Sequence, residues 1–132
     1  LINDLLLWMN ENKADYTNTF IYLINKNLLN KRLYKNEIFF SWHKRWEIRK
    51  SKEKKGEESL IKLMKNNNPY IIPRNHKVEE ALNSAVLKDN FEPMHNLLKA
   101  LKKPYDYNAK IEFYQSLPTE DEAKIYKTFC GT

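Results

Sequence analysis

Histidines and acidic pairs are the side chains of this sequence that could do metal or acid–base chemistry. The three histidines lie far apart and lack a second histidine or cysteine at metal-ligand spacing: His43, His76 and His95. Acidic neighbours occur at 57–58, 79–80 and 120–122. Adjacent residues of a helix point to different sides, so they make poor acid–base pairs. We therefore predict no metal site and no complete catalytic site in this chain.

A run of basic residues interleaved with aromatic side chains could bind nucleic acid. Beside Trp42 and Trp46 lie His43, Lys44, Arg45, Arg49 and Lys50. Such a pattern can hold single strands through phosphate contacts and base stacking, and the net charge of +6 would assist it. The two tryptophans share one helical face, however, and large aromatic side chains are usually buried. Packing in the core is therefore the favoured interpretation.

Arg74 and Cys130 are the remaining candidates. Arg74 follows an extended segment bounded by prolines, where it could bind an anion or tie the loop to carbonyl groups of a neighbouring element. We favour the tie. Cys130 is the only cysteine, so no disulfide can form within the chain, which suits a reducing, cytoplasmic compartment. Its thiol could reach a partner sulfur from a mobile tail, or could pack as an inert apolar group.

The elements that must position these residues are predicted to be helices. Apolar residues recur at spacings of three and four, and only two glycines and five prolines interrupt the chain. No glycine-rich loop is present to hold phosphates. The apolar start at 1–9 lacks a basic region and a cleavage site, and no segment is long enough to cross a membrane. We predict an all-α fold of six or seven helices, forming a single helical domain over 1–132 that is part of a larger chain.

Local signals place the expected helix boundaries. Residues 2–11 form a helix that is apolar almost all round, which is typical of a buried helix. Side-chain caps are expected before three later helices, at Asp15, Asn36 and Asn75. Residues 50–58 are predicted to be an exposed charged loop and 60–65 a short helix.

The second half of the chain has further boundary signals. Asn66, Asn67, Asn68 and Pro69 are expected to stop the preceding helix, and residues 70–73 to be extended. Asn90 can cap the helix that contains Pro93. Residues 105–118 are predicted to be irregular. Thr119 and Glu122 form a capping box before a short last helix.

Four segments in register resemble the selenoprotein O family over nearly the whole chain. They are residues 14–20 (ADYTNTF), 68–75 (NPYIIPRN), the stretch from 80 to 105, and the cysteine-bearing end at 128–132. Two positions depart from the family's pattern. Pro73 stands where leucine is usual and could alter the loop, and His76 replaces a larger residue.

The resemblance implies that this chain is the C-terminal helical region of a protein with a kinase-like fold. Members of that family transfer AMP from ATP to hydroxyl groups of serine, threonine or tyrosine in proteins. ATP and Mg²⁺ or Mn²⁺ would be held by a kinase-like catalytic lobe upstream in the same chain. This segment would be inactive by itself, and its partners would be that lobe and the protein substrates, with neither a membrane nor nucleic acid expected.

The resemblance also assigns roles to individual residues. Eight residues of the matched segments are expected to be structural: Asp15, Tyr16, Thr17, Phe20, Asn68, Pro69, Arg74 and Asn75. Cys130 is the redox candidate and would pair with a thiol outside this chain. Two alternatives from other classes stay open, a basic helical module that binds nucleic acid and a stand-alone helical interaction domain.

Overall fold

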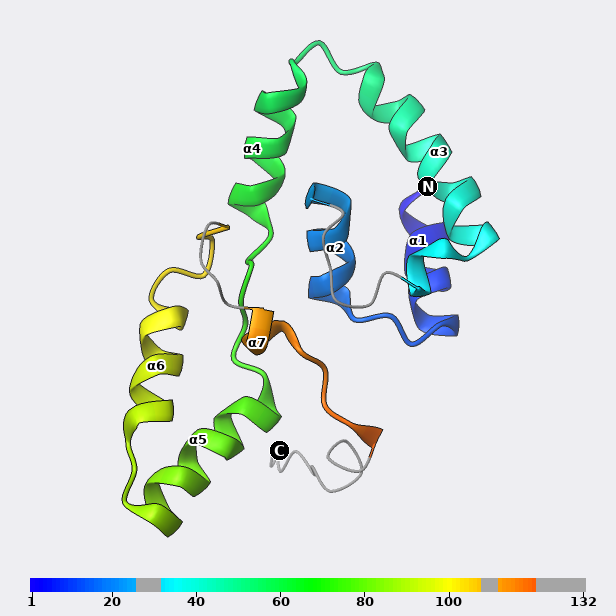
Figure 1. Ribbon diagram of the computed structural model, residues 1–132. Coiled ribbons are helices and arrows are strands. Elements are labelled where there is room, and N and C mark those ends of the chain that lie inside the picture. Colours follow the sequence, from blue (N-terminus) through cyan, green and yellow to red (C-terminus); the bar gives the residue numbers. More distant parts are fainter. Residues whose placement is uncertain (26–31, 108–111, 121–132) are drawn as a thin grey trace, which may run out of the picture. The chain divides into compact units, whose positions relative to one another are not determined.

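The computed structural model describes residues 1–25, 32–107 and 112–120 (Figure 1). The described residues form helices and no strand, which confirms the all-α prediction. The elements are α1 (Ile2–Glu11), α2 (Tyr16–Asn25), the 3-10 turn η1 (Leu33–Lys35), α3 (Glu37–Ser51), α4 (Glu57–Asn67), α5 (Asn75–Lys88), α6 (Glu92–Leu101) and α7 (Glu112–Gln115). No helix in the described ranges is long and apolar enough to span a membrane.

The chain divides into two compact units, and the single helical domain expected for 1–132 stays a prediction. The first unit is Leu1–Pro69 and the second is Tyr70–Thr132. The division falls at Pro69, within one of the segments that resemble the family. Each unit is described separately below.

Aromatic side chains form the core of the first unit. Phe39 of α3 is at its centre, with its ring centroid 4.6 Å from that of Trp8 and 5.2 Å from that of Tyr34. Tyr22 stacks on Tyr34 at 4.1 Å. Trp42 is also buried and lies 5.6 Å from Phe39. The aromatic residues thus join α1, α2, η1 and α3, because their large apolar rings gain most from leaving water.

Helix α1 has the predicted bounds but is not buried all round. Leu5, Trp8 and Met9 face the core, whereas Ile2 and Leu7 are 75% and 58% exposed. The expectation of a fully buried helix is therefore wrong within this chain. A helix packed on one side leaves its opposite side uncovered, whatever the residues there.

Helix α3 begins as predicted and extends further than predicted. The Asn36 side chain accepts hydrogen bonds from the amides of Ile38 and Phe39, so it is the N-cap. The helix continues to Ser51, and α4 already begins at Glu57. The exposed connection is therefore 52–56, within the charged loop expected at 50–58.

Helix α4 is longer at both ends than the expected 60–65. Glu57 and Glu58 in its first turn suit the positive end of the helix dipole. At the other end, the side chains of Asn67 and Asn68 donate to the carbonyl oxygens of Leu63 and Met64. These side-chain bonds add to the backbone bonds of the last turn, so Asn66 and Asn67 are part of the helix and Asn68 is its C-cap.

The second unit is built on the contact between α5 and α6. The predicted cap at Asn75 is wrong by one residue. The Arg74 carbonyl accepts from the amides of Lys77 and Val78, so Arg74 is the N-cap and Asn75 is the first helical residue. Asp89 ends α5 in the left-handed conformation, with φ of 50°. The Asn90 side chain accepts from the amide of Glu92, but the N-cap of α6 is Phe91, so the predicted cap lies one residue too early.

The extended segment after Pro69 is held by hydrogen bonds to Pro104 and Gln115. The amides of Tyr70 and Ile71 donate to the carbonyl of Pro104 at 2.6 and 3.3 Å. The Gln115 side chain donates to the Tyr70 carbonyl at 3.1 Å. Gln115 belongs to α7, a short helix inside the segment expected to be irregular at 105–118. Glu122, the second half of the predicted capping box, lies outside the described residues.

Candidate functional site

The residues at 15–20 cap and extend α2. Asp15 Oδ1 accepts a hydrogen bond from the Asn18 amide at 2.8 Å, which is the geometry of an N-cap. Tyr16 is exposed, and its ring lies 4.8 Å from that of Phe20 one turn later. Thr17 and Phe20 are half-buried. These residues cap α2 and pack along its surface, so their contacts are structural.

Thr19 is the buried residue of this segment, and the sequence pattern does not distinguish it as a functional position. It is 0% exposed, and its hydroxyl donates to the Asp15 carbonyl at 2.7 Å. The Thr19 oxygen also lies 3.2 Å from the hydroxyl oxygen of Tyr34. The spacing of four residues between Asp15 and Thr19 could have indicated the first bond. Nothing local could have indicated Tyr34.

Asn68 and Pro69 belong to the first unit, and Arg74 and Asn75 belong to the second. Asn68 ends α4, and Pro69 is the last residue of the first unit. Arg74 and Asn75 begin α5 in the second unit. Arg74 is buried, at 9% exposure, whereas Asn75 is exposed. Burial favours the predicted structural tie for Arg74, since a guanidinium is seldom buried unless it is held by other groups.

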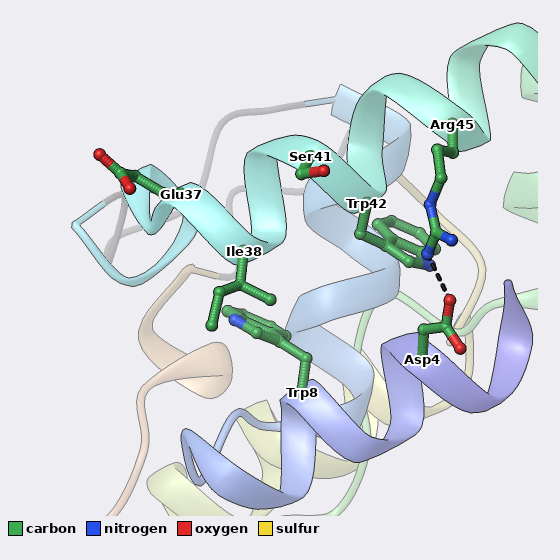
Figure 2. Close-up of a pocket in the computed structure, with 7 residues that line it drawn as sticks. All are labelled: Asp4, Trp8, Glu37, Ile38, Ser41, Trp42 and Arg45. Atoms are coloured by element: carbon green, nitrogen blue, oxygen red, sulfur yellow. Dashed lines mark hydrogen bonds and ion pairs between the residues drawn. The ribbon is translucent and has the colours of Figure 1, made fainter.

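A groove of about 350 Å³ lies between α1 and α3 in the first unit (Figure 2). Trp8 and Trp42 contribute their indole rings to it, and Ile38 lies over the Trp8 ring. The remaining lining residues are Asp4, Glu37, Ser41 and Arg45. The groove therefore combines an aromatic floor with a polar rim, a composition typical of binding surfaces.

An ion pair spans the two helices at one end of the groove. The Arg45 guanidinium donates to a carboxylate oxygen of Asp4 across 41 residues of sequence (Figure 2). This hydrogen bond holds the pKa of the Asp4 carboxyl below its usual value. Both side chains are about half exposed, so water screens the pair and its contribution to stability is small. The pair connects α1 to α3 at this end of the groove.

The two indole N–H groups of the groove differ in their partners. Trp42 Nε1 donates to the Leu1 carbonyl at 2.7 Å. Trp8 is only 2% exposed, and its Nε1 has no hydrogen-bond acceptor among the described residues. A buried donor without an acceptor costs about 1–3 kcal/mol. The Trp8 Nε1 group is therefore a buried hydrogen-bond donor whose acceptor does not lie among the described residues.

The basic residues of α3 have acidic or aromatic neighbours. Arg49 pairs with Glu53, and Lys50 with Glu47. The ammonium groups of Lys44 and Lys50 lie 4.5 and 4.8 Å from the centres of the Phe40 and Trp46 rings. Trp42 is buried and Trp46 half-buried. These contacts favour packing over a platform on which bases would stack.

The described residues do not fit a metal centre. No group of three or more His, Cys, Asp or Glu side chains in the described ranges could hold an ion. His43 lies between aromatic rings, 6.0 Å from Phe39 and 5.3 Å from Trp46. Cys130, the redox candidate, lies outside the described residues.

Helix capping, aromatic packing and the groove between α1 and α3 describe a helical structural segment. Comparison with known proteins then shows which family it comes from. The chain is 46% identical over all 132 residues to the protein nucleotidyltransferase YdiU of Bacillus thuringiensis subsp. konkukian (strain 97-27). It is 44% identical, again over its whole length, to the protein of the same name from Bacillus cytotoxicus.

The chain therefore belongs to the selenoprotein O family, as its motifs had indicated. It covers 100% of its own length in each alignment but spans only 27% of the length of these relatives. No family model matches the chain. No solved structure matches it.

Proposed function

We propose that this chain is a helical supporting region of a protein nucleotidyltransferase. The observation that carries the proposal is the identity of 44–46% over the whole chain to relatives that are named protein nucleotidyltransferase. The roles of Asp15 and Asn68 support it, because both residues complete helix ends. In this proposal, the longer protein acts on its substrates and this region stabilises it.

The finer activity follows the resemblance. The longer protein transfers AMP from ATP to serine, threonine or tyrosine hydroxyl groups of other proteins, and its catalytic part has a kinase-like fold. In this proposal, ATP and Mg²⁺ or Mn²⁺ are held by the kinase-like part of the longer protein, as the resemblance implies. We place the reaction in the cytoplasm, where ATP and protein substrates are available.

Label transfer from ATP tests this proposal. The full-length protein and the 132-residue chain are incubated separately with Mg²⁺ or Mn²⁺, an acceptor protein and ATP labelled in the α- or the γ-phosphate. We expect the full-length protein to transfer the α-label and not the γ-label, because AMP retains only the α-phosphate. The chain alone should transfer neither. Transfer by the chain alone would place a catalytic site in these residues, and transfer of the γ-label would indicate a kinase.

We further propose that Cys130 regulates the longer protein by forming a disulfide with a thiol elsewhere in it. Two thiols would lose two electrons and two protons to a disulfide oxidant such as oxidised glutathione. Peptide mapping without reductant, on oxidised full-length protein, should find Cys130 joined to a second cysteine. The Cys130→Ser variant should then make activity insensitive to the oxidant. An unpaired Cys130 after oxidation contradicts this role.

The net charge of +6 supports nucleic acid as the partner in a second candidate function. Binding to single strands that weakens steeply with salt would favour it. The contacts of Arg45, Arg49 and Lys50 with acidic residues count against it, since those charges are already partly neutralised.

Exposed apolar side chains would also suit a stand-alone interaction domain, the third candidate. Ile2 and Leu7 of α1 and Val86 and Leu87 of α5 are among them. A chain that is a stable monomer without the rest of the protein, and binds a separate partner through these residues, would favour this function.

A further inference from the structure

The groove between α1 and α3 is apolar at its floor and open at its rim. Ile38 lines it and is 63% exposed, although its side chain lies over the buried Trp8 ring (Figure 2). On α1, the exposed Leu7 lies one turn beyond Asp4, another lining residue. An isolated exposed leucine is ordinary, but exposed apolar side chains beside an aromatic groove mark an interaction surface.

The indole of Trp8 gives the groove a specific polar requirement. Its Nε1 group is buried and has no acceptor among the described residues. Its described ring neighbours include Tyr34 and Phe39, whose ring centroids lie at 5.9 and 4.6 Å, and Ile38 lies over it (Figure 2). A partner that completes the site should therefore supply an apolar side chain for the groove and a hydrogen-bond acceptor for this donor, and a backbone carbonyl oxygen meets the second need.

The rest of the longer protein is the occupant that best fits these requirements. The chain spans 27% of the length of its relatives, so most of such a protein lies outside residues 1–132. A polypeptide segment offers an apolar side chain and a backbone carbonyl within one residue of each other. The other groove tryptophan, Trp42, already donates its Nε1 to a backbone carbonyl, that of Leu1.

We propose that a segment of the full-length protein outside residues 1–132 docks in the groove between α1 and α3. Its apolar side chain packs against Trp8, Trp42 and Ile38, and its backbone carbonyl accepts from Trp8 Nε1. The Ile38 side chain moves aside to admit that carbonyl. The inference rests on the proposal that this chain works within the longer protein, and it is independent of the reaction that the protein performs.

Photo-crosslinking in the full-length protein tests the occupant. The two variants carry p-benzoylphenylalanine in place of Ile38 or Ile48. Ile48 is the matched control, because it is the same residue type on the same helix, is 58% exposed and does not line the groove. We expect position 38 to crosslink within one molecule to a peptide outside residues 1–132, at several times the yield of position 48. Crosslinks between molecules would assign the groove to a second copy and overturn the proposal, as would equal yields at the two positions.

Thermal unfolding of the same full-length protein gives a second readout. Ile38→Asp should lower its melting temperature by about 2–4 °C or more, because a carboxylate would be buried beneath the docked segment. Ile48→Asp should leave it nearly unchanged. Equal shifts in the two variants would contradict docking. Label transfer by a protein that does not crosslink at position 38 would overturn only the docking. A crosslink at that position without label transfer would overturn only the proposed activity.

Discussion

The Thr19 hydroxyl oxygen lies 3.2 Å from the Tyr34 hydroxyl oxygen, inside the first unit. Thr19 has one hydroxyl proton and donates it to the Asp15 carbonyl, so Tyr34 must be the donor between the two hydroxyls. Burial raises the pKa of Tyr34, which keeps that proton in place. One threonine therefore links the start of α2 to the turn η1.

Thr19→Val should destabilise the first unit by about 1–3 kcal/mol, because the valine cannot accept the Tyr34 proton. Urea unfolding followed by circular dichroism measures this loss. The control is a double-mutant cycle with Tyr34→Phe, which removes the donor. Coupling of about 0.5–1.5 kcal/mol is expected between the two substitutions. Additive effects would mean that the hydroxyl pair contributes nothing.

Asp15→Ala should cost about 0.5–2 kcal/mol, because the Asn18 amide loses its acceptor at the N-terminus of α2. Asp15→Asn is the matched control, since asparagine caps helices about as well as aspartate. The same urea titration should show nearly full stability for the Asn variant. If both variants lose equal stability, the carboxylate charge and not the cap is responsible.

Tyr107 should make the second unit sensitive to alkaline pH. Burial raises the pKa of Tyr107 from 10.0 to about 12, with the nearby Tyr70 adding to the effect. The folded state therefore favours the protonated phenol. This contribution to stability is complete below pH 10 and is lost as the pH rises from 10 through about 12.

Ultraviolet titration of phenolate formation measures this pKa. The difference between the wild-type protein and Tyr107→Phe should show one group that titrates near pH 12. Unfolding temperatures should fall less steeply above pH 10 in the Phe variant. A difference curve centred near pH 10 would contradict the burial of this ring.

Gln115→Ala should loosen the extended segment after Pro69. The Gln115 side chain is 4% exposed and donates to the Tyr70 carbonyl, so its removal is expected to cost about 1–3 kcal/mol. Hydrogen exchange at the amides of Tyr70 and Ile71 should accelerate by about tenfold or more, since 1.4 kcal/mol is a factor of ten. Leu117→Ala, at an exposed position nearby, is the control and should leave both amides protected. Unchanged exchange in the Gln115 variant would show that the Pro104 carbonyl alone holds the segment.

Helix ends were predictable where the signal is local. Asp15 and Asn36 bond to amides two or three residues away, so the residue type and its position suffice. Asn75 was misplaced by one residue because Arg74, without a side-chain cap, accepts the first helical bonds through its backbone carbonyl. Backbone carbonyls are the same in every residue, so the sequence does not distinguish them.

The candidate groove was not predictable, although Trp42 and Arg45 had been noted. Their partners, Trp8 and Asp4, come from a helix more than thirty residues earlier. The face of α1 that is buried depends on where α3 lies, and so does the register between Asp4 and Arg45. The sequence pattern indicated only that α1 is apolar.

The sequence by itself determined the helical class, most helix starts and the family. Helix caps form between residues two or three positions apart, and the order of the motifs can be read directly from the sequence. Only the tertiary structure decided the division into two units, the pairing of Thr19 with Tyr34 and the groove with its unsatisfied indole. The physical reason is that burial and long-range hydrogen bonds depend on how distant segments meet, and that is set by packing of the whole chain.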